Sequence, residues 1–148
     1  MRTFMPSVKD IMTKNVITID QDKSIFEAAE LMVDKGIGCL VITRQDTPVG
    51  IVTERDFVRR VVAKRGSFDA KVFGIMSKYL ITVGPETSLK DASRFMSKNK
   101  IHRLPVTKDG KLVGIVVASD FVRNVGKKTN TEEILDALGR YPANTGIT

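Results

Sequence analysis

Two short stretches of the sequence place a carboxylate three residues after the end of a run of β-branched residues. In the first, Asp56 follows Thr53, and in the second Asp120 follows Val117 at the same spacing. Where a strand leads into a helix, such a carboxylate can accept hydrogen bonds from both hydroxyls of a ribose, and free backbone N–H groups favour a phosphate. The same side chains could instead only cap the helix, and the spacing alone favours capping.

Both stretches belong to an internal repeat. A shift of 64 residues aligns residues 8–61 with residues 72–125 without a gap, and 21 of the 54 aligned pairs are identical. Self-similarity at a fixed period indicates duplicated structure. Because there are only two copies, a compact pseudo-symmetric pair is expected rather than a solenoid.

Each copy predicts the element order β-α-β-β-α, which makes the fold class α/β, with a small mixed sheet and helices on one side. β-Branched runs predict strands, and apolar residues at helical spacing predict helices. The predicted strands are 16–19, 39–43 and 49–53 in the first copy, and 80–83, 103–107 and 112–117 in the second. The helices are expected to begin at Asp22 or Ser24, between Glu86 and Ser88, near Asp56 and near Asp120.

The chain is therefore divided into repeat one at 7–62, a polar linker at 63–71 and repeat two at 72–126. A C-terminal tail follows at 127–148. Within the tail, residues 131–138 predict a short helix that Gly139 stops, and the last residues are expected to be disordered.

The composition and the sparse reactive residues exclude several classes of protein. No run of about 18 apolar residues is present, and no apolar stretch follows the first Met, so we expect a cytoplasmic protein without a membrane span or signal peptide. The single cysteine, Cys39, and the single histidine, His102, cannot form an internal disulfide or a zinc site. No catalytic triad, Walker lysine or paired-carboxylate pattern is present, so we expect no enzymatic activity.

The ordered motifs resemble the cystathionine-β-synthase (CBS) domain, and the chain resembles a free-standing tandem CBS pair, or Bateman module. Pairs of this family have two clefts that commonly hold AMP, ADP, ATP or S-adenosylmethionine. The resemblance implies a regulatory module that senses such a ligand and passes a conformational change to a partner protein. It covers roughly residues 7–126 and rests on Asp10–Met12, Gly74–Met76, Ile17-Thr18, Ile81-Thr82, His102–Val106, Gly50–Asp56 and Gly114–Asp120.

The resemblance also implies that residues of both repeats complete each cleft. Arg103 suits a phosphate because its guanidinium is an always-charged fork, and apolar residues suit the faces of a purine. His102 suits either a phosphate or a hydrogen-bonded position without a ligand. The main cleft is predicted to contain Thr53, Arg55, Asp56, Tyr79, Leu80, Ile81, Thr82, Ile101, His102 and Arg103.

The second predicted cleft departs from the family pattern. Val117 stands where the first repeat has Thr53, and its opposite wall has no counterpart of His102 and Arg103, so we expect weaker binding of phosphorylated ligands. Cys39 is expected to be a small wall residue rather than a nucleophile. The second cleft is predicted to contain Asn15, Val16, Ile17, Ile37, Gly38, Cys39, Ser119 and Asp120.

The formal net charge of +7 is concentrated in repeat two, which has nine basic and four acidic residues between 72 and 125. Its first predicted helix carries Lys90, Arg94 and Lys98 on one face, where repeat one has Glu30 and Asp34. Because the family dimerises through these helices, opposite charges favour a head-to-tail homodimer. The alternative function is nucleic-acid binding by the basic second repeat and linker, although no known reader motif accompanies the charge.

Overall fold

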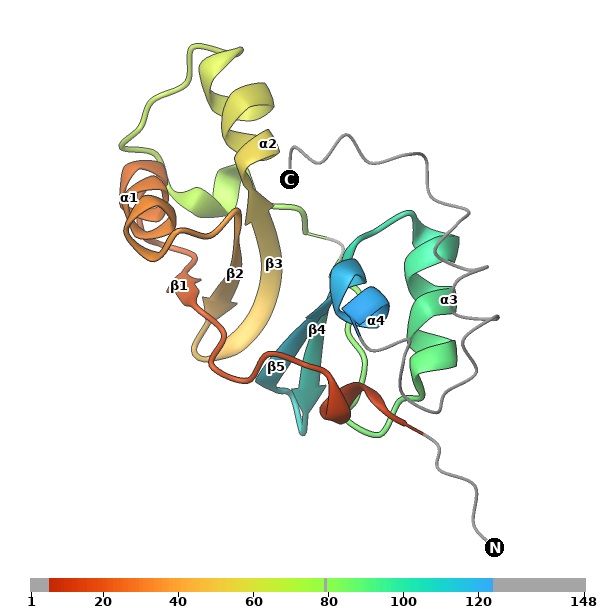
Figure 1. Cartoon of the computed structure of the whole chain (residues 1–148). Helices are drawn as coiled ribbons and strands as arrows, with labels where there is room; N and C mark the ends of the chain where they lie inside the picture. Colours follow the sequence, from red (N-terminus) through yellow and green to blue (C-terminus); the bar gives the residue numbers. More distant parts are fainter. Residues whose placement is uncertain (1–5, 79, 124–148) are drawn as a thin grey trace, which may run out of the picture. The chain divides into compact units, whose positions relative to one another are not determined.

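The computed structural model describes residues 6–78 and 80–123 of the 148-residue chain (Figure 1). They form two compact units, which we name by the repeat that supplies most of their residues. Among the described residues, the repeat-one unit spans Ile17–Leu80, and the repeat-two unit combines residues 6–16 with residues 81–123. The predicted tail, including the helix expected at 131–138, lies outside the described residues.

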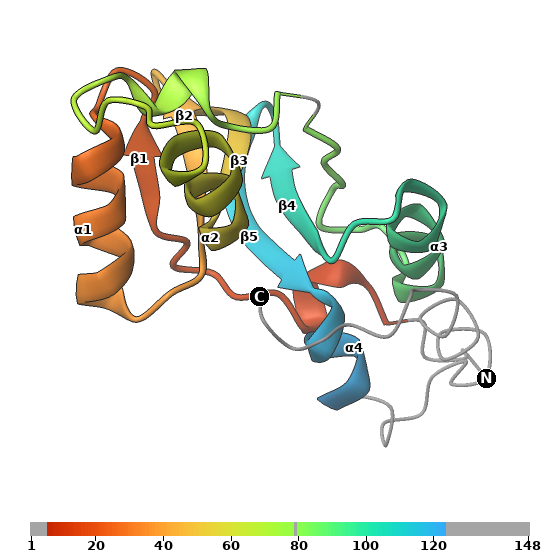
Figure 2. The same cartoon turned by 90° about the horizontal axis from the view of Figure 1, so that it is seen from above.

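The repeat-one unit contains a mixed sheet with the strand order β1-β2-β3 (Figure 2). Strand β1 is Thr18–Asp20, β2 is Cys39–Arg44 and β3 is Thr47–Thr53. Strand β1 runs parallel to β2, and β2 runs antiparallel to β3. The β2–β3 hairpin turns at two residues with positive φ, Gln45 at 50° and Asp46 at 65°, as a type I′ turn requires. The two strands predicted at 39–43 and 49–53 are therefore neighbours in one hairpin.

Local signals set both ends of helix α1 (Ile25–Lys35). The Ser24 hydroxyl accepts a hydrogen bond from the Glu27 N–H at 3.0 Å, and the Glu27 carboxylate accepts one from the Ser24 N–H at 2.9 Å. This reciprocal pair is a capping box. Gly36, with φ of 63°, ends the helix in the left-handed conformation. Of the two predicted starting residues, Ser24 is therefore the N-cap.

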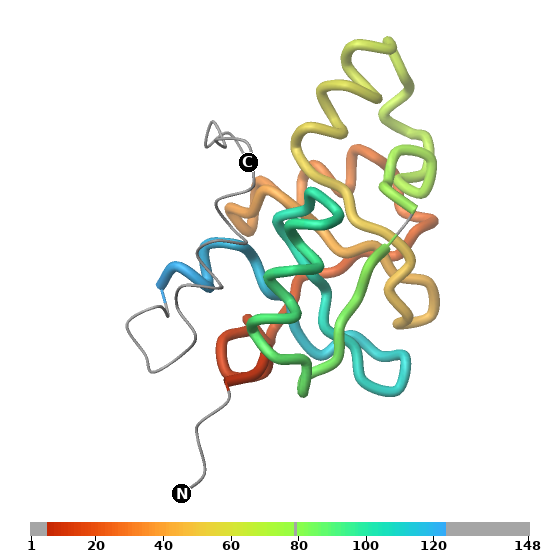
Figure 3. The backbone as a smooth tube through the Cα atoms, turned by 90° about the vertical axis from the view of Figure 1, so that its right-hand side faces the viewer, coloured from red at the N-terminus to blue at the C-terminus, as the bar shows by residue number. Residues whose placement is uncertain are grey.

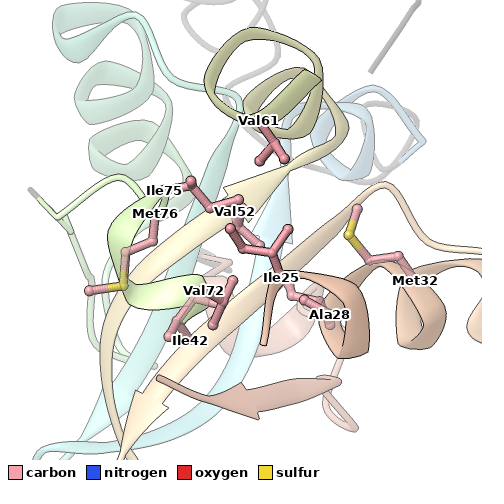
Figure 4. Packing of buried hydrophobic residues seen from close by; sticks show 10 residues of the cluster. Ile25, Ala28, Met32, Ile42, Val52, Val61, Val72, Ile75 and Met76 are labelled. Carbon is pink, nitrogen blue, oxygen red and sulfur yellow. The ribbon is translucent and has the colours of Figure 1, made fainter. Parts of the chain in front are cut away.

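Helix α1 and the helical segment after β3 bury apolar side chains against the sheet (Figure 4). The segment begins as α2 (Glu54–Asp56) and continues as a π-helical stretch, η2 (Phe57–Val62). Because such burial removes apolar surface from water, it supplies the main stabilising free energy of the unit. The buried cluster consists of Ile25, Ala28, Met32, Leu40, Ile42, Val52, Val61, Val72, Ile75 and Met76.

The repeat-two unit has the corresponding hairpin, β4 (Arg103–Lys108) with β5 (Lys111–Val117). Its helices are α3 (Leu89–Asn99) and α4 (Ala118–Arg123). No helix among the described residues is both long enough and apolar enough to cross a bilayer. The core of the unit consists of Val8, Val83, Leu89, Ala92, Met96, Leu104, Val106, Val116 and Phe121.

The strand predicted at 80–83 is wrong beyond one residue, because only Val83 pairs, through an isolated parallel bridge to Val106. In repeat one, the N–H of Gln21 extends the pairing by bonding to the Thr43 carbonyl at 2.8 Å. Repeat two has Pro85 at the position that matches Gln21, and proline has no N–H to donate. That missing donor explains why the pairing does not extend beyond Val83. The predicted residues 80–82 lie on the other side of Val83, where Pro105 stands at the position of Val41, the partner of Thr18, and also has no N–H to donate.

The opening segment of each repeat packs in the other repeat's unit. The turn η1 (Val8–Asp10) lies beside the start of α3 (Figure 3), where the Val8 N–H donates to the Thr87 carbonyl at 2.8 Å. The turn η3 (Val72–Gly74) packs in the repeat-one unit, where the Val72 N–H donates to the Lys23 carbonyl at 2.8 Å. Both valines are completely buried. Each core is therefore completed by a segment that is distant in sequence.

Replacing Gly50 by alanine is expected to destabilise the protein by about 1–3 kcal/mol, as overpacking of a core typically does. A Cβ at Gly50 would lie 2.5 Å from Met76 Sδ and 2.7 Å from the Ser77 carbonyl oxygen. Gly74→Ala is the control, because a Cβ there has no atom within 4 Å. Urea unfolding measures both variants, and equal stability of the two would contradict the close packing of Met76 and Ser77, which follow η3, against β3.

Candidate functional site

In the repeat-one unit, Thr53 and Asp56 form one hydrogen-bonded group where β3 ends. Asp56 Oδ2 accepts a hydrogen bond from the Thr53 N–H at 2.8 Å and one from the Thr53 hydroxyl at 3.3 Å. Asp56 Oδ1 lies 3.6 Å from Arg60 Nε, and 16% of the Asp56 side chain is exposed. The carboxylate therefore caps the helix, as the spacing favours, and still reaches the surface.

The beginning of β2 lies beside this group. Cys39 pairs with Thr53 in the β2–β3 register, and the Glu54 N–H donates to the Gly38 carbonyl at 3.1 Å. A Cβ at Gly38 would make an ordinary contact with Glu54 Oε1, at 3.5 Å, so the Glu54 carboxylate lies close to the start of β2. The end of β3 and the start of β2 thus bring a hydroxyl, two carboxylates and a half-buried thiol to one edge of the unit.

The repeat-two unit has the matching arrangement with different side chains. Arg103 pairs with Val117 in the β4–β5 register, and the Ala118 N–H donates to the His102 carbonyl at 2.9 Å. Asp120 Oδ2 accepts from the Val117 N–H at 2.9 Å, and Asp120 Oδ1 accepts a hydrogen bond from Arg123. Asp120 is buried, whereas His102 and Arg103 are half-buried. This edge therefore has cationic and imidazole groups but lacks the hydroxyl of Thr53.

The residues predicted for each cleft are divided between the two units. Each predicted cleft takes residues from both units, so the two clefts remain predictions, and Tyr79 lies outside the described residues. The repeat-one unit holds Ile17, Ile37, Gly38, Cys39, Thr53, Arg55, Asp56 and Leu80. The repeat-two unit holds Asn15, Val16, Ile81, Thr82, Ile101, His102, Arg103, Ser119 and Asp120.

Burial and the neighbouring Arg103 cation lower the pKa of His102 below its ordinary value of 6.5. As the pH falls below that value, His102 of the unfolded chain takes up a proton before His102 of the folded protein does, so the free energy of unfolding decreases. This contribution of His102 to the free energy of unfolding is fully present above the pKa that His102 has in the unfolded chain. It is lost as the pH falls from that value towards the pKa of His102 in the folded protein.

His102→Gln is expected to remove this part of the acid sensitivity. Urea unfolding of the parent protein and the variant, at pH values of about 7.5 and 5.5, isolates the contribution of His102 from that of the carboxylates. An unchanged pH dependence in the variant would contradict the direction of the pKa shift.

An apolar groove of about 540 Å³ lies in the repeat-one unit, and the sequence analysis did not predict it. One wall is α1, and the other is formed by residues of η2 and by Phe68. The signal in the sequence was the pair Phe26 and Val33, which lie one heptad apart on α1 and outside its buried stripe. The groove is lined by Ile25, Phe26, Ala29, Met32, Val33, Gly36, Ile37, Gly38, Glu54, Phe57, Val61, Val62 and Phe68.

Comparison with known proteins finds the same two-repeat organisation. The family model of the CBS domain matches residues 8–63 and 72–127. The CBS domain-containing protein YhcV of Bacillus subtilis (strain 168) is 38% identical over 120 residues, covering 81% of this chain and 86% of YhcV.

Solved structures agree with this match. The CBS-domain containing protein ATU1752 from Agrobacterium tumefaciens has a TM-score of 0.71 and 31% identity, over 80% of this chain and 98% of its own. The CBS domain pair of protein MJ0100, solved in complex with 5′-methylthioadenosine and S-adenosyl-L-methionine, has a TM-score of 0.73 and 32% identity. That similarity covers 84% of this chain and 98% of the MJ0100 chain.

Proposed function

The chain belongs to the CBS domain family as a tandem pair, and from this premise we propose that it is a regulatory module that binds an adenosine-containing ligand. One observation carries the proposal: in each unit, a carboxylate that follows the last strand lies beside the start of the neighbouring strand. The adenosyl compounds held by the related MJ0100 pair support the ligand class. Binding of AMP, ADP, ATP or S-adenosylmethionine changes the conformation that a partner protein recognises.

At the repeat-one edge, Asp56 and Thr53 are the proposed ribose ligands. A carboxylate accepts hydrogen bonds only, so it can bind both hydroxyls of a cis-diol. The Thr53 hydroxyl can turn from Asp56 towards the ligand, and Arg55 and Gly38 lie beside it. Apolar residues next to the start of β2, such as Ile37, suit the face of an adenine.

At the repeat-two edge, Arg103 and His102 are the proposed phosphate ligands. Arg103 offers parallel N–H groups to phosphate oxygens, and these charge-assisted hydrogen bonds are stronger than neutral ones. Val117 offers no hydroxyl at the position of Thr53, so the ribose there depends on Asp120 and the exposed Ser119. The two edges should therefore contribute unequally to binding.

A thermal-shift screen of AMP, ADP, ATP, S-adenosylmethionine, NAD and guanine nucleotides tests the proposal. A ligand that binds only the folded state must raise the Tm. At a ligand concentration of a hundred times the Kd, it adds about 2.7 kcal/mol to the free energy of unfolding. We expect adenosyl compounds to raise the Tm and guanine nucleotides to have no effect. If no adenosyl compound shifts the Tm, the chain is not an adenosine sensor.

Asp56→Asn and Asp120→Asn are expected to weaken ligand binding while keeping the helix caps, because the amide oxygen can still accept the backbone N–H. Loss of one charge-assisted hydrogen bond of about 1.5–3 kcal/mol corresponds to an affinity lowered roughly 10- to 100-fold. Isothermal titration measures the affinity. The free energy of unfolding in urea shows whether the helix cap is kept. Full affinity in both variants, at unchanged stability, would contradict the assigned role.

The proposed assembly is a head-to-tail homodimer. Helix α1 exposes Glu30 and Asp34, and helix α3 exposes Arg94 and Lys98, so pairing α1 of one copy with α3 of another brings opposite charges together. Such a dimer should weaken at high salt. Size-exclusion chromatography at low and high salt tests this, and a crosslink between repeat two and repeat two would contradict it.

A further inference from the structure

Arg60 joins the proposed ribose carboxylate to a segment of repeat two that packs in the repeat-one unit. Its Nε lies 3.6 Å from Asp56 Oδ1. Its Nη1 donates to the Ile75 carbonyl at 3.2 Å and to the Met76 carbonyl at 3.4 Å. One guanidinium therefore contacts a carboxylate with one nitrogen and two backbone carbonyls with another, which a planar group with several N–H donors allows.

The contacted segment is short and has its own hydrogen bonds to β3. The Ser77 N–H donates to the Ile51 carbonyl at 2.8 Å, and the Ile51 N–H donates to the Ser77 carbonyl at 3.2 Å. Ile75 and Met76 belong to the buried core cluster of the unit. Arg60 thus contacts the backbone immediately before this pair of hydrogen bonds, and the hydrogen exchange of the Ser77 N–H reports how firmly the segment is held.

Asp56 can bind a ligand and Arg60 at the same time. Its Oδ2 accepts both hydrogen bonds from Thr53, whereas its Oδ1 faces Arg60. Because an ionised carboxylate has about four lone-pair sites, a ribose hydroxyl can bind Oδ1 without displacing the guanidinium. The side chains of Asp56 and Arg60 are 16% and 52% exposed, so solvent weakens their ion pair when no ligand is bound. A bound hydroxyl would fix the carboxylate opposite Arg60.

We propose that Arg60 is a positioning residue that couples ligand binding at Asp56 to the segment 75–78, an inference that rests on the proposed ligand site of the repeat-one unit. A ligand that fixes Asp56 also fixes the guanidinium, which then holds the two carbonyls more firmly. Binding and the order of the segment are therefore coupled, and each favours the other. Asn124, which carries no charge, stands at the matching position of repeat two, so we expect this coupling in repeat one only.

Hydrogen exchange of the ligand-free, full-length chain tests the contact itself. Asp56→Asn removes the charge that faces Arg60, so the Ser77 N–H should exchange about 2- to 5-fold faster, as the loss of a partly exposed ion pair implies. The Gln21 N–H, which bonds to the Thr43 carbonyl, is the internal control and should not change. In an Arg60→Met background, Asp56→Asn should not accelerate Ser77 further. Equal acceleration in both backgrounds would overturn the proposal.

A second measurement compares hydrogen exchange with and without AMP at saturating concentration. AMP should slow the exchange of the Ser77 N–H about 2- to 5-fold in the parent protein and have no such effect in Arg60→Met. A purely structural role of Arg60 would leave the AMP-induced difference unchanged. Arg59→Met is the matched control and should keep the difference, because Arg59 is exposed and forms no ion pair or side-chain hydrogen bond with other described residues.

The outcomes separate the role of Arg60 from the proposed ligand. Slowing of Ser77 by AMP that persists in Arg60→Met would overturn the role of Arg60, although the chain would still bind the nucleotide. Absence of AMP binding to the parent protein would instead contradict the adenosine-binding function. In that case the ligand-free comparison of Asp56→Asn in the two backgrounds decides whether Arg60 couples the carboxylate to the segment.

Discussion

Arg103→Ala is expected to weaken the binding of ATP about 10- to 100-fold. Hydrogen bonds between charged partners contribute about 1.5–3 kcal/mol, and 1.4 kcal/mol corresponds to a factor of ten. Arg103 begins β4 and is half-buried, so its backbone is held by the sheet rather than by a loop. Isothermal titration of both proteins measures the change.

Two control variants distinguish the effect of the bidentate guanidinium geometry of Arg103 from the effect of its charge. Arg94→Ala removes the same charge from the exposed face of α3 and should leave the affinity nearly unchanged. Arg103→Lys keeps the charge and loses the bidentate geometry, so its affinity should lie between those of the parent and Arg103→Ala. ATP binding by Arg103→Ala as tight as that of the parent would exclude Arg103 as a phosphate ligand.

A double-mutant cycle identifies the carboxylate that shares a ligand with Arg103. The family resemblance groups Arg103 with Asp56, whereas in the repeat-two unit Arg103 pairs with Val117, whose N–H donates to Asp120. We therefore expect the effects of Arg103→Ala and Asp120→Asn on affinity to be non-additive, because residues that contact one ligand are coupled. Coupling to Asp56→Asn alone would support the grouping made from the sequence.

Much of the fold was predictable because local signals determine it. Ser24 and Glu27 form the capping box of α1, and Gln45 with Asp46 forms the β2–β3 turn. Each of these features involves residues that are close in the chain, so a short sequence pattern is enough to predict it. The strand at 80–83 was overestimated because the missing N–H of Pro105 matters only once β4 is known to be its partner strand.

The placement of the opening segments could not be predicted from the repeat. Val8 and Val72 are identical in the alignment of the two copies, as are Met12 and Met76. Identical residues carry no information on which of two similar cores they enter. The same limit applies to the site, since a repeat shows which residues correspond but not which ones are adjacent. The groove escaped prediction because its second wall is formed by η2 and Phe68, which the pattern of one helix does not show.

Val8→Ala is expected to destabilise the repeat-two unit by about 1.5–3 kcal/mol, although Val8 opens repeat one. Deleting two buried methyl groups removes transfer free energy and leaves a cavity. Val8 is fully buried in the core cluster of that unit, which also includes Leu89, Met96 and Leu104. Urea unfolding measures the size of the effect, and hydrogen exchange of the native protein shows where protection is lost.

Val72→Ala is the matched variant, because it deletes the same groups from the core of the repeat-one unit. If the opening segments are exchanged, Val8→Ala lowers protection in β4, β5 and α3, and Val72→Ala lowers it in β2, β3 and α1. The opposite assignment would mean that each segment packs in its own repeat. Each opening segment precedes a predicted ligand-binding strand. A ligand that stabilises one unit should therefore also slow the hydrogen exchange of the valine N–H in the segment that completes its core. This connects the exchanged segments to the proposed sensing function.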